Sequence, residues 1–212
     1  MHKGEIMEIK GHTIEFIEDG HIYLVDGVIT PTVTQLLHFK FNHKYDHVSS
    51  SVLNSAADKG TAVHKAIEDY CVNGTESDLP ELRNFKFLQK KYDFKVLGNE
   101  IPVLLFKDDK PICAGRFDLA IFKDGVNGLA DIKRTSTLDK EYLGYQLNLY
   151  RIAYMQCYGG AIDFLAGIHL RENTRKFVNI PINEDLIWQF IEEWEAQNDS
   201  RAIESDIESI FR

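Results

Sequence analysis

Cysteine is scarce in this 212-residue sequence. Its three cysteines, Cys71, Cys113 and Cys157, are odd in number and lie far apart along the chain. Disulfide frameworks, zinc ribbons and iron–sulfur clusters all draw on paired or closely spaced cysteines. We therefore expect no disulfide framework, no zinc ribbon and no iron–sulfur cluster.

Long hydrophobic runs are missing as well. No stretch approaches the roughly 18 consecutive apolar residues of a membrane-spanning helix. The opening residues, MHKGEIMEIKGH, contain no apolar signal region. We therefore expect a protein that neither enters the membrane nor is exported, and that works in the cytoplasm.

An excess of positive charge is also absent, because 24 Lys and Arg residues stand against 33 Asp and Glu residues and give a net charge of −9. A nucleic-acid partner normally requires a basic surface. Enzymes that hold metal ions with carboxylates can nevertheless be acidic overall, with their basic residues confined to one groove. The net charge alone therefore leaves the kind of partner open.

The composition that is present, 44% hydrophobic and 27% charged residues, is that of an ordinary globular protein. The length suits one domain with a sizeable core. We predict a single domain over 1–212. An N-terminal hairpin and helices (1–95) precede the core (96–180), and C-terminal helices (181–212) end the chain.

The N-terminal part begins with strand patterns. Alternating runs at Thr13–Ile17 and His21–Val25, each followed by a turn that contains glycine, predict a β-hairpin. Thr32 is placed to cap a short helix over Val33–Leu37. The first strands and the first helix are therefore expected within about forty residues of the start.

Further helices are predicted from apolar residues at spacings of three and four. One covers 48–74, with Gly60 as an interruption or a junction between two helices, and another covers 81–94. Two more are expected at the end of the chain, around Trp188–Glu195 and Ile203–Phe211.

Three extended runs, at 95–106, 111–122 and 126–135, are separated only by short turn sequences. Short connections join antiparallel strands, so these runs predict an antiparallel meander. The strongest helix pattern, 138–159, comes next, and strand patterns follow it. The fold class expected is α/β, with a mixed central β-sheet flanked by helices and the core order α-β-β-β-α-β.

Charged residues stand inside two of these apolar runs: Asp118 in the second, and Asp131 and Lys133 in the third. Unpaired buried charges are strongly unfavourable, so they need an explanation. Neighbouring strands lie about 4.8 Å apart, and carboxylates at matching heights can then share one divalent cation. Lys133 leaves the same strand face as Asp131 and can stabilise developing negative charge. The plainer alternative is an ion pair between Asp131 and Lys133 on an exposed strand.

Four motifs occur in order along the chain. They are Lys59-Gly60-Thr61-Ala62-Val63-His64, Gly115-Arg116-Phe117-Asp118, Asp131-Ile132-Lys133 and Gln146-Leu147-Asn148-Leu149-Tyr150. They resemble the G-x-x-x-H, G-x-x-D, (D/E)-x-K and Q-x-x-x-Y motifs of the PD-(D/E)XK nuclease superfamily, in its RecB-like and phage exonuclease branch. The resemblance covers roughly residues 23–170 and implies a restriction-endonuclease-like core. The proline of the family name is absent, as it is in many RecB-like members.

The resemblance implies a metal site for one or two Mg²⁺ or Mn²⁺ ions. Asp118 and Asp131 would bind the metal, with the Ile132 backbone carbonyl and His64 as further ligands. Glu100, in the first core strand, stands where related enzymes often place another acid. Two alternatives stay open: His64 is an ordinary packed histidine, or Glu100 is an edge-strand charge that faces water.

The resemblance also implies that Lys133 is the catalytic lysine. Gln146 and Tyr150 lie one turn apart on one helix face and would orient the site or touch DNA phosphates. For these two residues, packing of the helix face is the alternative. No cofactor other than the metal is implied.

The function expected from the resemblance is a metal-dependent deoxyribonuclease, most simply an exonuclease of phage or prophage recombination and repair. Its partners would be DNA and a single-strand annealing protein, in the cytoplasm of a bacterial or phage-infected cell. A ring of identical subunits is known for the phage relatives, so a homo-oligomer is one expectation. An endonuclease of the same fold, or an inactive module that binds DNA or protein, are the alternatives.

Overall fold

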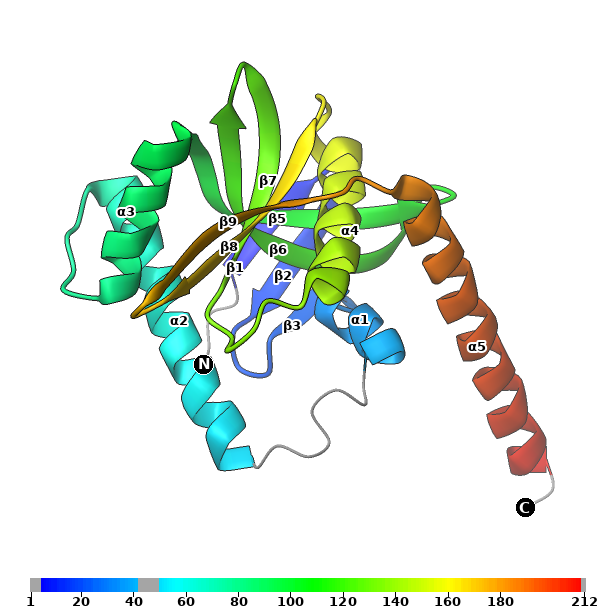
Figure 1. Ribbon diagram of the computed structural model, residues 1–212. Coiled ribbons are helices and arrows are strands. Elements are labelled where there is room, and N and C mark those ends of the chain that lie inside the picture. The colour runs from blue at the N-terminus through cyan, green and yellow to red at the C-terminus, as the bar shows by residue number, and fades with distance from the viewer. Residues whose placement is uncertain (1–4, 42–49, 211–212) are drawn as a thin grey trace. The chain divides into compact units, whose positions relative to one another are not determined.

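The computed structural model describes residues 5–41 and 50–210, and the side chains of 5–41 and 58–198. It divides into two compact units, Met1–Ile182 and Asn183–Arg212. The first unit contains two sheets and four helices, and the second contains a single helix (Figure 1). The chain therefore has the α/β class that the sequence predicts.

The N-terminal sheet is an antiparallel meander of four short strands, β1 (Glu5–Ile9), β2 (His12–Ile17), β3 (Ile22–Val25) and β4 (Val28–Thr30). The predicted hairpin is confirmed as β2 and β3, which pair from Ile14↔Val25 to Ile17↔Ile22. The sequence patterns missed β1 and β4. Asp26 and Gly27 both have positive φ, 51° and 80°, which suits the tight turn that leads into β4.

The predicted short helix is confirmed as α1 (Val33–Phe41), which runs four residues beyond its predicted end. Thr32 caps it, because the Gln35 amide donates to Thr32 Oγ1 at 3.0 Å and the Thr32 amide donates to Gln35 Oε1 at 2.8 Å. This reciprocal pair satisfies two amide groups at the start of the helix.

The next helix, α2 (Ser50–Asn73), is continuous, so the prediction of an interruption or junction at Gly60 is wrong. A single glycine in a helix costs only about 1 kcal/mol, and the apolar side chains after it supply the packing that holds the helix together. Residues 48–49 of the predicted helix lie outside the described residues. After a loop, α3 (Pro80–Tyr92) follows.

The second sheet has five strands in the order of the sequence: β5 (Lys95–Lys107), β6 (Lys110–Lys123), β7 (Val126–Lys133), β8 (Phe164–Arg171) and β9 (Thr174–Ile180). The predicted meander is confirmed as β5–β7. The pair β7 and β8 is parallel, and the other pairs are antiparallel. A parallel pair requires a crossover, which is α4 (Lys140–Tyr158), the predicted long helix.

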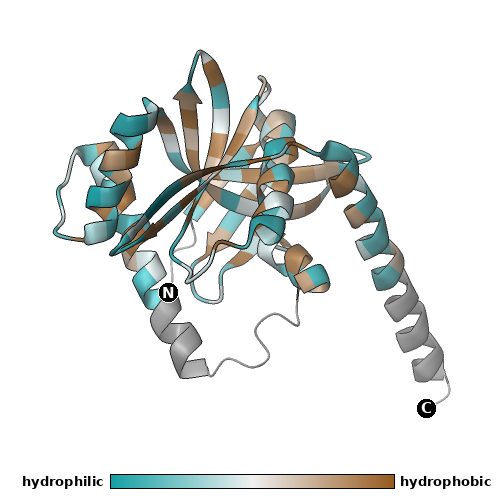
Figure 2. Cartoon of the chain, viewed as in Figure 1, coloured by the Kyte–Doolittle hydropathy of each residue, from teal (hydrophilic) through white to brown (hydrophobic). Residues whose placement is uncertain are grey.

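Helices cover both faces of this sheet. On one face, Val63 and Ile67 of α2 and Phe85 of α3 join Ile121 and other strand residues in a buried cluster. On the other face, α4 lies across the strands (Figure 1). Figure 2 shows the hydrophobic residues of the strands and the alternation of hydrophobic and hydrophilic residues along α3.

The N-terminal sheet is joined to the five-stranded sheet near β6. Ile14 and Tyr23 of the first sheet share a buried cluster with Leu104 and Ala114 of the second. Thr32 and Ala114 form a parallel bridge, and the Ala114 amide donates to the Pro31 carbonyl at 2.9 Å. The N-terminal strands are therefore held against the part of β6 that leads to Asp118.

The C-terminal unit is one helix, α5 (Glu184–Ile210), which starts where the Leu186 amide donates to Asn183 Oδ1 at 3.1 Å. The prediction of two helices is therefore wrong. No glycine or proline stands between Glu184 and Ile210, so nothing in the sequence breaks the helix. In the described ranges, no helix is long and apolar enough to cross a membrane.

Candidate active site

One cavity of about 520 Å³ collects the side chains that the sequence singles out. It is lined, among others, by His64, Glu100, Asp118, Asp131, Lys133, Gln146 and Tyr150. These residues come from α2, three neighbouring strands and α4. His64 and Tyr150, which are 86 positions apart in sequence, thus line the same cavity.

The three acids form a row across the sheet. Pairing of Asn99 with Leu119 and of Ile101 with Phe117 places Glu100 opposite Asp118. The β6–β7 register, continued by one residue beyond its last pair, places Asp118 opposite Asp131. Side chains opposite one another on antiparallel strands share a face. The predicted matching heights of the carboxylates follow from this register.

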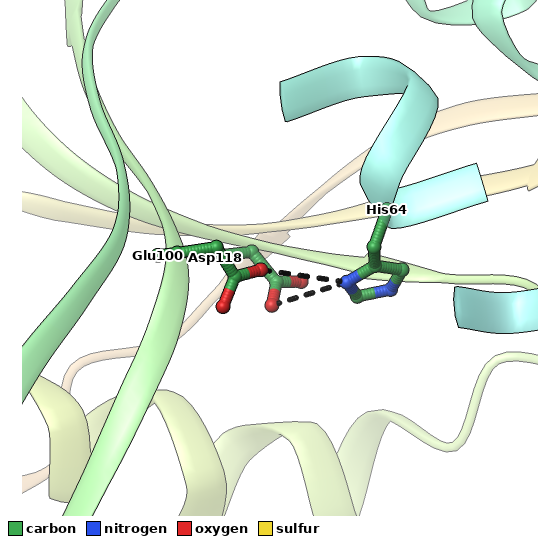
Figure 3. A group of neighbouring side chains, drawn as sticks. All are labelled: His64, Glu100 and Asp118. Atoms are coloured by element: carbon green, nitrogen blue, oxygen red, sulfur yellow. Dashed lines mark ion pairs between the residues drawn. The ribbon is translucent and has the colours of Figure 1, made fainter. Parts of the chain in front are cut away.

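His64 lies over two of these acids (Figure 3). Its Nδ1 is 3.4 Å from Asp118 Oδ1 and 4.0 Å from Glu100 Oε1. One ligand atom from each of the three residues falls within 4.8 Å of the others. Asp131 does not belong to this tight group, although the sequence patterns pair it with Asp118 as a ligand.

Glu100 has an unusual backbone. Its φ of 48° lies in the left-handed region, which non-glycine residues rarely adopt. Strain of this kind persists only where the surrounding structure enforces it, and it is found most often at functional positions. Here the β5–β6 ladder on either side holds Glu100 in place opposite Asp118.

The Ile132 peptide group fixes two residues of the cluster. Its amide donates to Asp118 Oδ2 at 2.5 Å, and its carbonyl lies 3.0 Å from His64 Nε2. A carbonyl only accepts, so His64 Nε2 carries the hydrogen and Nδ1 is directed at the carboxylates. A backbone carbonyl that orients a histidine in this way is a common companion of metal ligation. The Ile132 carbonyl, predicted as a ligand, here contacts His64.

Asp131 and Lys133 form a buried ion pair with an Nζ–Oδ2 distance of 2.6 Å. The Asp131 side chain is only 3% exposed, so the exposed ion pair considered from the sequence is not what the structure contains. Asp131 Oδ2 is therefore already in contact with the Lys133 ammonium. A metal ion that used this oxygen would share it with Lys133.

The charged side chains of the cavity shift one another's pKa values. Burial lowers the pKa of His64, but the carboxylates of Asp118 and Glu100 outweigh burial and raise the pKa to about 11. Burial raises the pKa of Asp118, but His64 and Lys133 together hold it below its usual value. At neutral pH, the cavity therefore holds a protonated His64 against an ionised Asp118.

The second pair behaves differently. Burial raises the pKa of Asp131 to about 6, and Asp118 adds to this rise against the opposing charge of Lys133. Burial lowers the pKa of Lys133, but Asp131 and Asp118 raise it overall. Lys133 is consequently an ammonium at neutral pH, with 23% of its side chain exposed to the cavity.

Gln146 and Tyr150 project from α4 and are buried. Gln146 Oε1 has no hydrogen-bond partner in the part of the chain that the structure describes. A Cβ added to Gly115 would lie 2.9 Å from Tyr150 Cε1 and 3.1 Å from Val33 Cγ2. Gly115 thus lets the tyrosine of one motif approach the strand of another.

Several residues of the cavity were missed from the sequence. Phe16, Glu18 and His21 reach it from the N-terminal sheet, which no local pattern connects with the core strands. Glu68, also missed, lies one turn after His64, so helical periodicity could have placed it on the same face.

Two arginines next to the motif acids and Lys133 in sequence, Arg116 and Arg134, are both paired with acids that do not line the cavity. Arg116 donates to Glu5 Oε2 at 2.6 Å and lies over the ring of Phe16. Arg134 donates to Glu81 Oε1 at 2.8 Å, and this acid is buried in α3. Both arginines hold elements of the fold together around the cavity.

The residues of the cavity fit a divalent cation. His64 Nδ1 and one oxygen each from Glu100 and Asp118 are close enough to meet at one ion, and the buried Asp131 carboxylate, paired with Lys133, lines the same cavity. Mg²⁺ and Mn²⁺ prefer oxygen ligands, and imidazole nitrogen is acceptable to transition metals such as Mn²⁺.

Comparisons with known proteins give little further information. No protein-family model matches the sequence, and no curated protein matches it. Among solved structures, the chain is similar to the crystal structure of SSO0001, with 17% sequence identity and a TM-score of 0.45. That likeness covers 79% of this chain and 76% of the other.

Proposed function

We propose that this protein is a metal-dependent deoxyribonuclease built on a restriction-endonuclease-like core. The observation that carries the proposal is the meeting of Glu100, Asp118, Asp131, His64 and Lys133 in one cavity. The order α-β-β-β-α-β along α3, β5, β6, β7, α4 and β8 supports the same core.

The resident metal would be Mg²⁺ or Mn²⁺, held by His64, Glu100 and Asp118, with Asp131 beside them. Such an ion polarises a phosphoryl oxygen and makes a bound water acidic enough to become a nucleophile near neutral pH. Either effect requires acidic ligands that are already ionised. The lowered pKa of Asp118 meets this requirement.

Lys133 supplies positive charge next to the metal ligands. Its ammonium is paired with Asp131 and partly exposed to the cavity, so it is positioned before any substrate arrives. In phosphodiester hydrolysis, negative charge builds up on the phosphate oxygens, and a fixed cation in a poorly hydrated cavity stabilises that charge. Loss of the ammonium should therefore slow the chemical step more than it weakens DNA binding.

Gln146 and Tyr150 would shape the wall of the cavity opposite His64. The free carbonyl oxygen of Gln146 can accept a hydrogen bond from a water near the metal ligands. Burial, together with the charges of Asp131 and Asp118, holds the pKa of Tyr150 well above its usual value, so its hydroxyl stays protonated. It is then a hydrogen-bond donor.

Exonuclease action on DNA in phage-type recombination or repair is our more specific proposal, and it rests on the motif resemblance. The same resemblance suggests a single-strand annealing protein as partner and a ring of identical subunits. An endonuclease would use the same residues, so the substrates below are chosen to separate the two.

The test is digestion of end-labelled linear duplex, linear single strand and closed circular DNA with Mg²⁺, Mn²⁺ or EDTA. Two variants change residues of the cavity, Asp118→Asn and Lys133→Ala. Their matched controls, Asp124→Asn and Lys110→Ala, change exposed residues outside the cavity. We expect metal-dependent loss of linear DNA, reduced about 10²-fold or more in both cavity variants and unchanged in both controls.

Nicking or linearisation of circles would replace the exonuclease proposal with an endonuclease of the same site. Unchanged cleavage in Asp118→Asn and Lys133→Ala would overturn the site. If the protein binds DNA but cleaves none of the substrates with either metal, an inactive binding module would be favoured.

A further inference from the structure

Basic residues are concentrated in two segments of this acidic chain. Segments 83–95 and 171–176 together contain eight Lys or Arg residues and two acids, Asp93 and Glu172, although the whole chain has a net charge of −9. The first segment covers most of α3, and the second covers the turn between β8 and β9. The candidate active site uses none of these basic residues.

The structure brings the two segments together. Asn84 of α3 is buried and donates to the carbonyls of Arg171 and Glu172 at 2.8 and 3.2 Å, which ties the β8–β9 turn to the helix. Tyr92 of α3 stacks on Phe177 of β9 with ring centroids 4.8 Å apart. A charged surface can therefore continue from α3 onto β9.

Arg83, Phe87 and Lys90 lie on one face of α3, at spacings of four and three, and line the same shallow groove. Phe87 is 43% exposed, and the guanidinium of Arg175 lies 3.7 Å from the centre of its ring. The aromatic ring thus fixes an arginine of β9 beside the two cations of α3.

We name Arg83, Phe87, Lys90 and Arg175 the α3–β9 basic face. Its three basic side chains are exposed, and none has an acidic partner within ion-pair distance among the residues that the structure describes. By contrast, the neighbouring Lys86 is paired with Glu76 at 2.6 Å. Asp93 is an acid on the same groove.

Fixed, unpaired cations beside an exposed ring suit a polyanion. DNA carries one phosphate per about 3.4 Å on each strand, and α3, with 13 residues, is about 20 Å long. Arg83 and Lys90 are seven residues apart, so their separation along the axis of α3 is about 10 Å. The two cations can therefore contact different phosphates of one DNA backbone.

We propose that the α3–β9 basic face binds the sugar–phosphate backbone of DNA, as a second contact outside the active-site cavity. The choice of DNA rests on the proposed function. Arg134 connects the two regions, because it follows Lys133 in sequence and bonds to Glu81 in the first turn of α3. The face and the cavity thus belong to one rigid arrangement of α3 and β7.

The test is fluorescence anisotropy of a labelled short duplex in EDTA, titrated with the full chain over roughly 50–200 mM salt. The charge-reversed variant is Lys90→Glu with Arg175→Glu. Its matched control, Lys10→Glu with Lys110→Glu, changes the same charge at exposed positions on other strands and turns.

We expect the face variant to bind about tenfold or more weakly and the slope of log affinity against log salt to fall by about 2. The control should keep at least half of the wild-type affinity. Equal affinity and slope in the face variant and the control overturn the proposal. Unchanged thermal unfolding of the face variant excludes misfolding as the cause of weaker binding.

Failure of this inference differs from failure of the proposed function. If the protein cleaves DNA with Mg²⁺ but the charge reversal leaves its DNA affinity unchanged, only the proposal for the α3–β9 basic face is contradicted. A chain whose affinity falls with the charge reversal, but which cleaves no DNA with either metal, contradicts only the nuclease proposal.

Discussion

Single residues determine how closely the segments that form the candidate site approach one another. Gly115 is one of them, because its missing side chain leaves room for the ring of Tyr150. In the sequence it is only the first residue of the motif that ends at Asp118. In the structure it allows the strand of this motif to lie close to Tyr150, because a Cβ at Gly115 would clash with the buried ring and with Val33 of α1.

Gly115→Ala should therefore lower both stability and cleavage. We expect a loss of about 1–3 kcal/mol in the free energy of unfolding, because the buried ring must move to accept the methyl group. Gly144→Ala is the matched control. A Cβ at Gly144, in α4, meets nothing within 4 Å, so the substitution should raise stability by about 0.5–1 kcal/mol. Urea unfolding measures both. Equal stability changes would contradict the account.

His64 gives the candidate metal site a pH dependence. In the metal-free protein its pKa is about 11, so at pH 7 it carries a proton that must leave before Nδ1 can bind a metal. Metal and proton compete, and a higher pH favours the metal. We expect the Mn²⁺ affinity to rise about tenfold per pH unit between pH 7 and 9, with about one proton released per ion.

Calorimetry in two buffers of different ionisation enthalpy measures this proton release directly. His64→Gln should abolish the pH dependence and weaken Mn²⁺ binding, whereas His38→Gln, an exposed histidine of α1, should do neither. Mn²⁺ affinity that is independent of pH would show that His64 is not a ligand.

At the scale of helices and strands, one ion pair connects α3 to the end of β7, the strand that carries Asp131 and Lys133. Glu81 is 4% exposed in the first turn of α3, and Arg134, just beyond the end of β7, is its partner. Such a pair contributes little net stability, but removal of one partner leaves a buried charge without compensation.

Arg134→Ala should consequently destabilise the chain by about 2–4 kcal/mol, slightly reduced because Arg134 is 23% exposed. Replacement of both partners, as Glu81→Leu with Arg134→Ala, should recover most of that loss. Arg83→Ala, an exposed arginine of the same helix, should stay within about 0.5 kcal/mol of wild type. Thermal and urea unfolding of the three variants give the comparison. A double variant no more stable than Arg134→Ala would contradict this account.

The same scale shows which predictions from the sequence could succeed. The meander β5–β7 and helix α4 were predictable, because alternating and helical patterns there are long and bounded by turns. The single helices α2 and α5 were predicted less well. A glycine at position 60 and a polar stretch after Glu195 look like breaks, but neither residue type interrupts helical hydrogen bonding.

Across the whole molecule, the candidate site could be predicted only in part. The motif residues pointed to Asp118, Asp131 and Lys133, and the register of the strands brings them together. The closeness of His64 to Glu100 depends on how α2 lies over β5, and the contribution of Phe16 and His21 depends on how the two sheets join. Such long-range placements leave no local sequence signal.

Charge is also organised at this scale. The cavity gathers acids and one lysine, while the unpaired cations of the α3–β9 basic face lie on another surface of an acidic chain. This separation of charge agrees with the proposed nuclease, in which one region would bind a metal ion and the other would bind DNA.

The central claim is that His64, Glu100 and Asp118 hold the catalytic metal. Anomalous diffraction from crystals soaked in Mn²⁺ tests it most directly. The account predicts a peak within about 2.0–2.3 Å of His64 Nδ1 and of one oxygen each from Glu100 and Asp118. The peak should be absent in Asp118→Asn crystals that still diffract. A strong Mn²⁺ peak elsewhere, with this cluster empty, would contradict the claim.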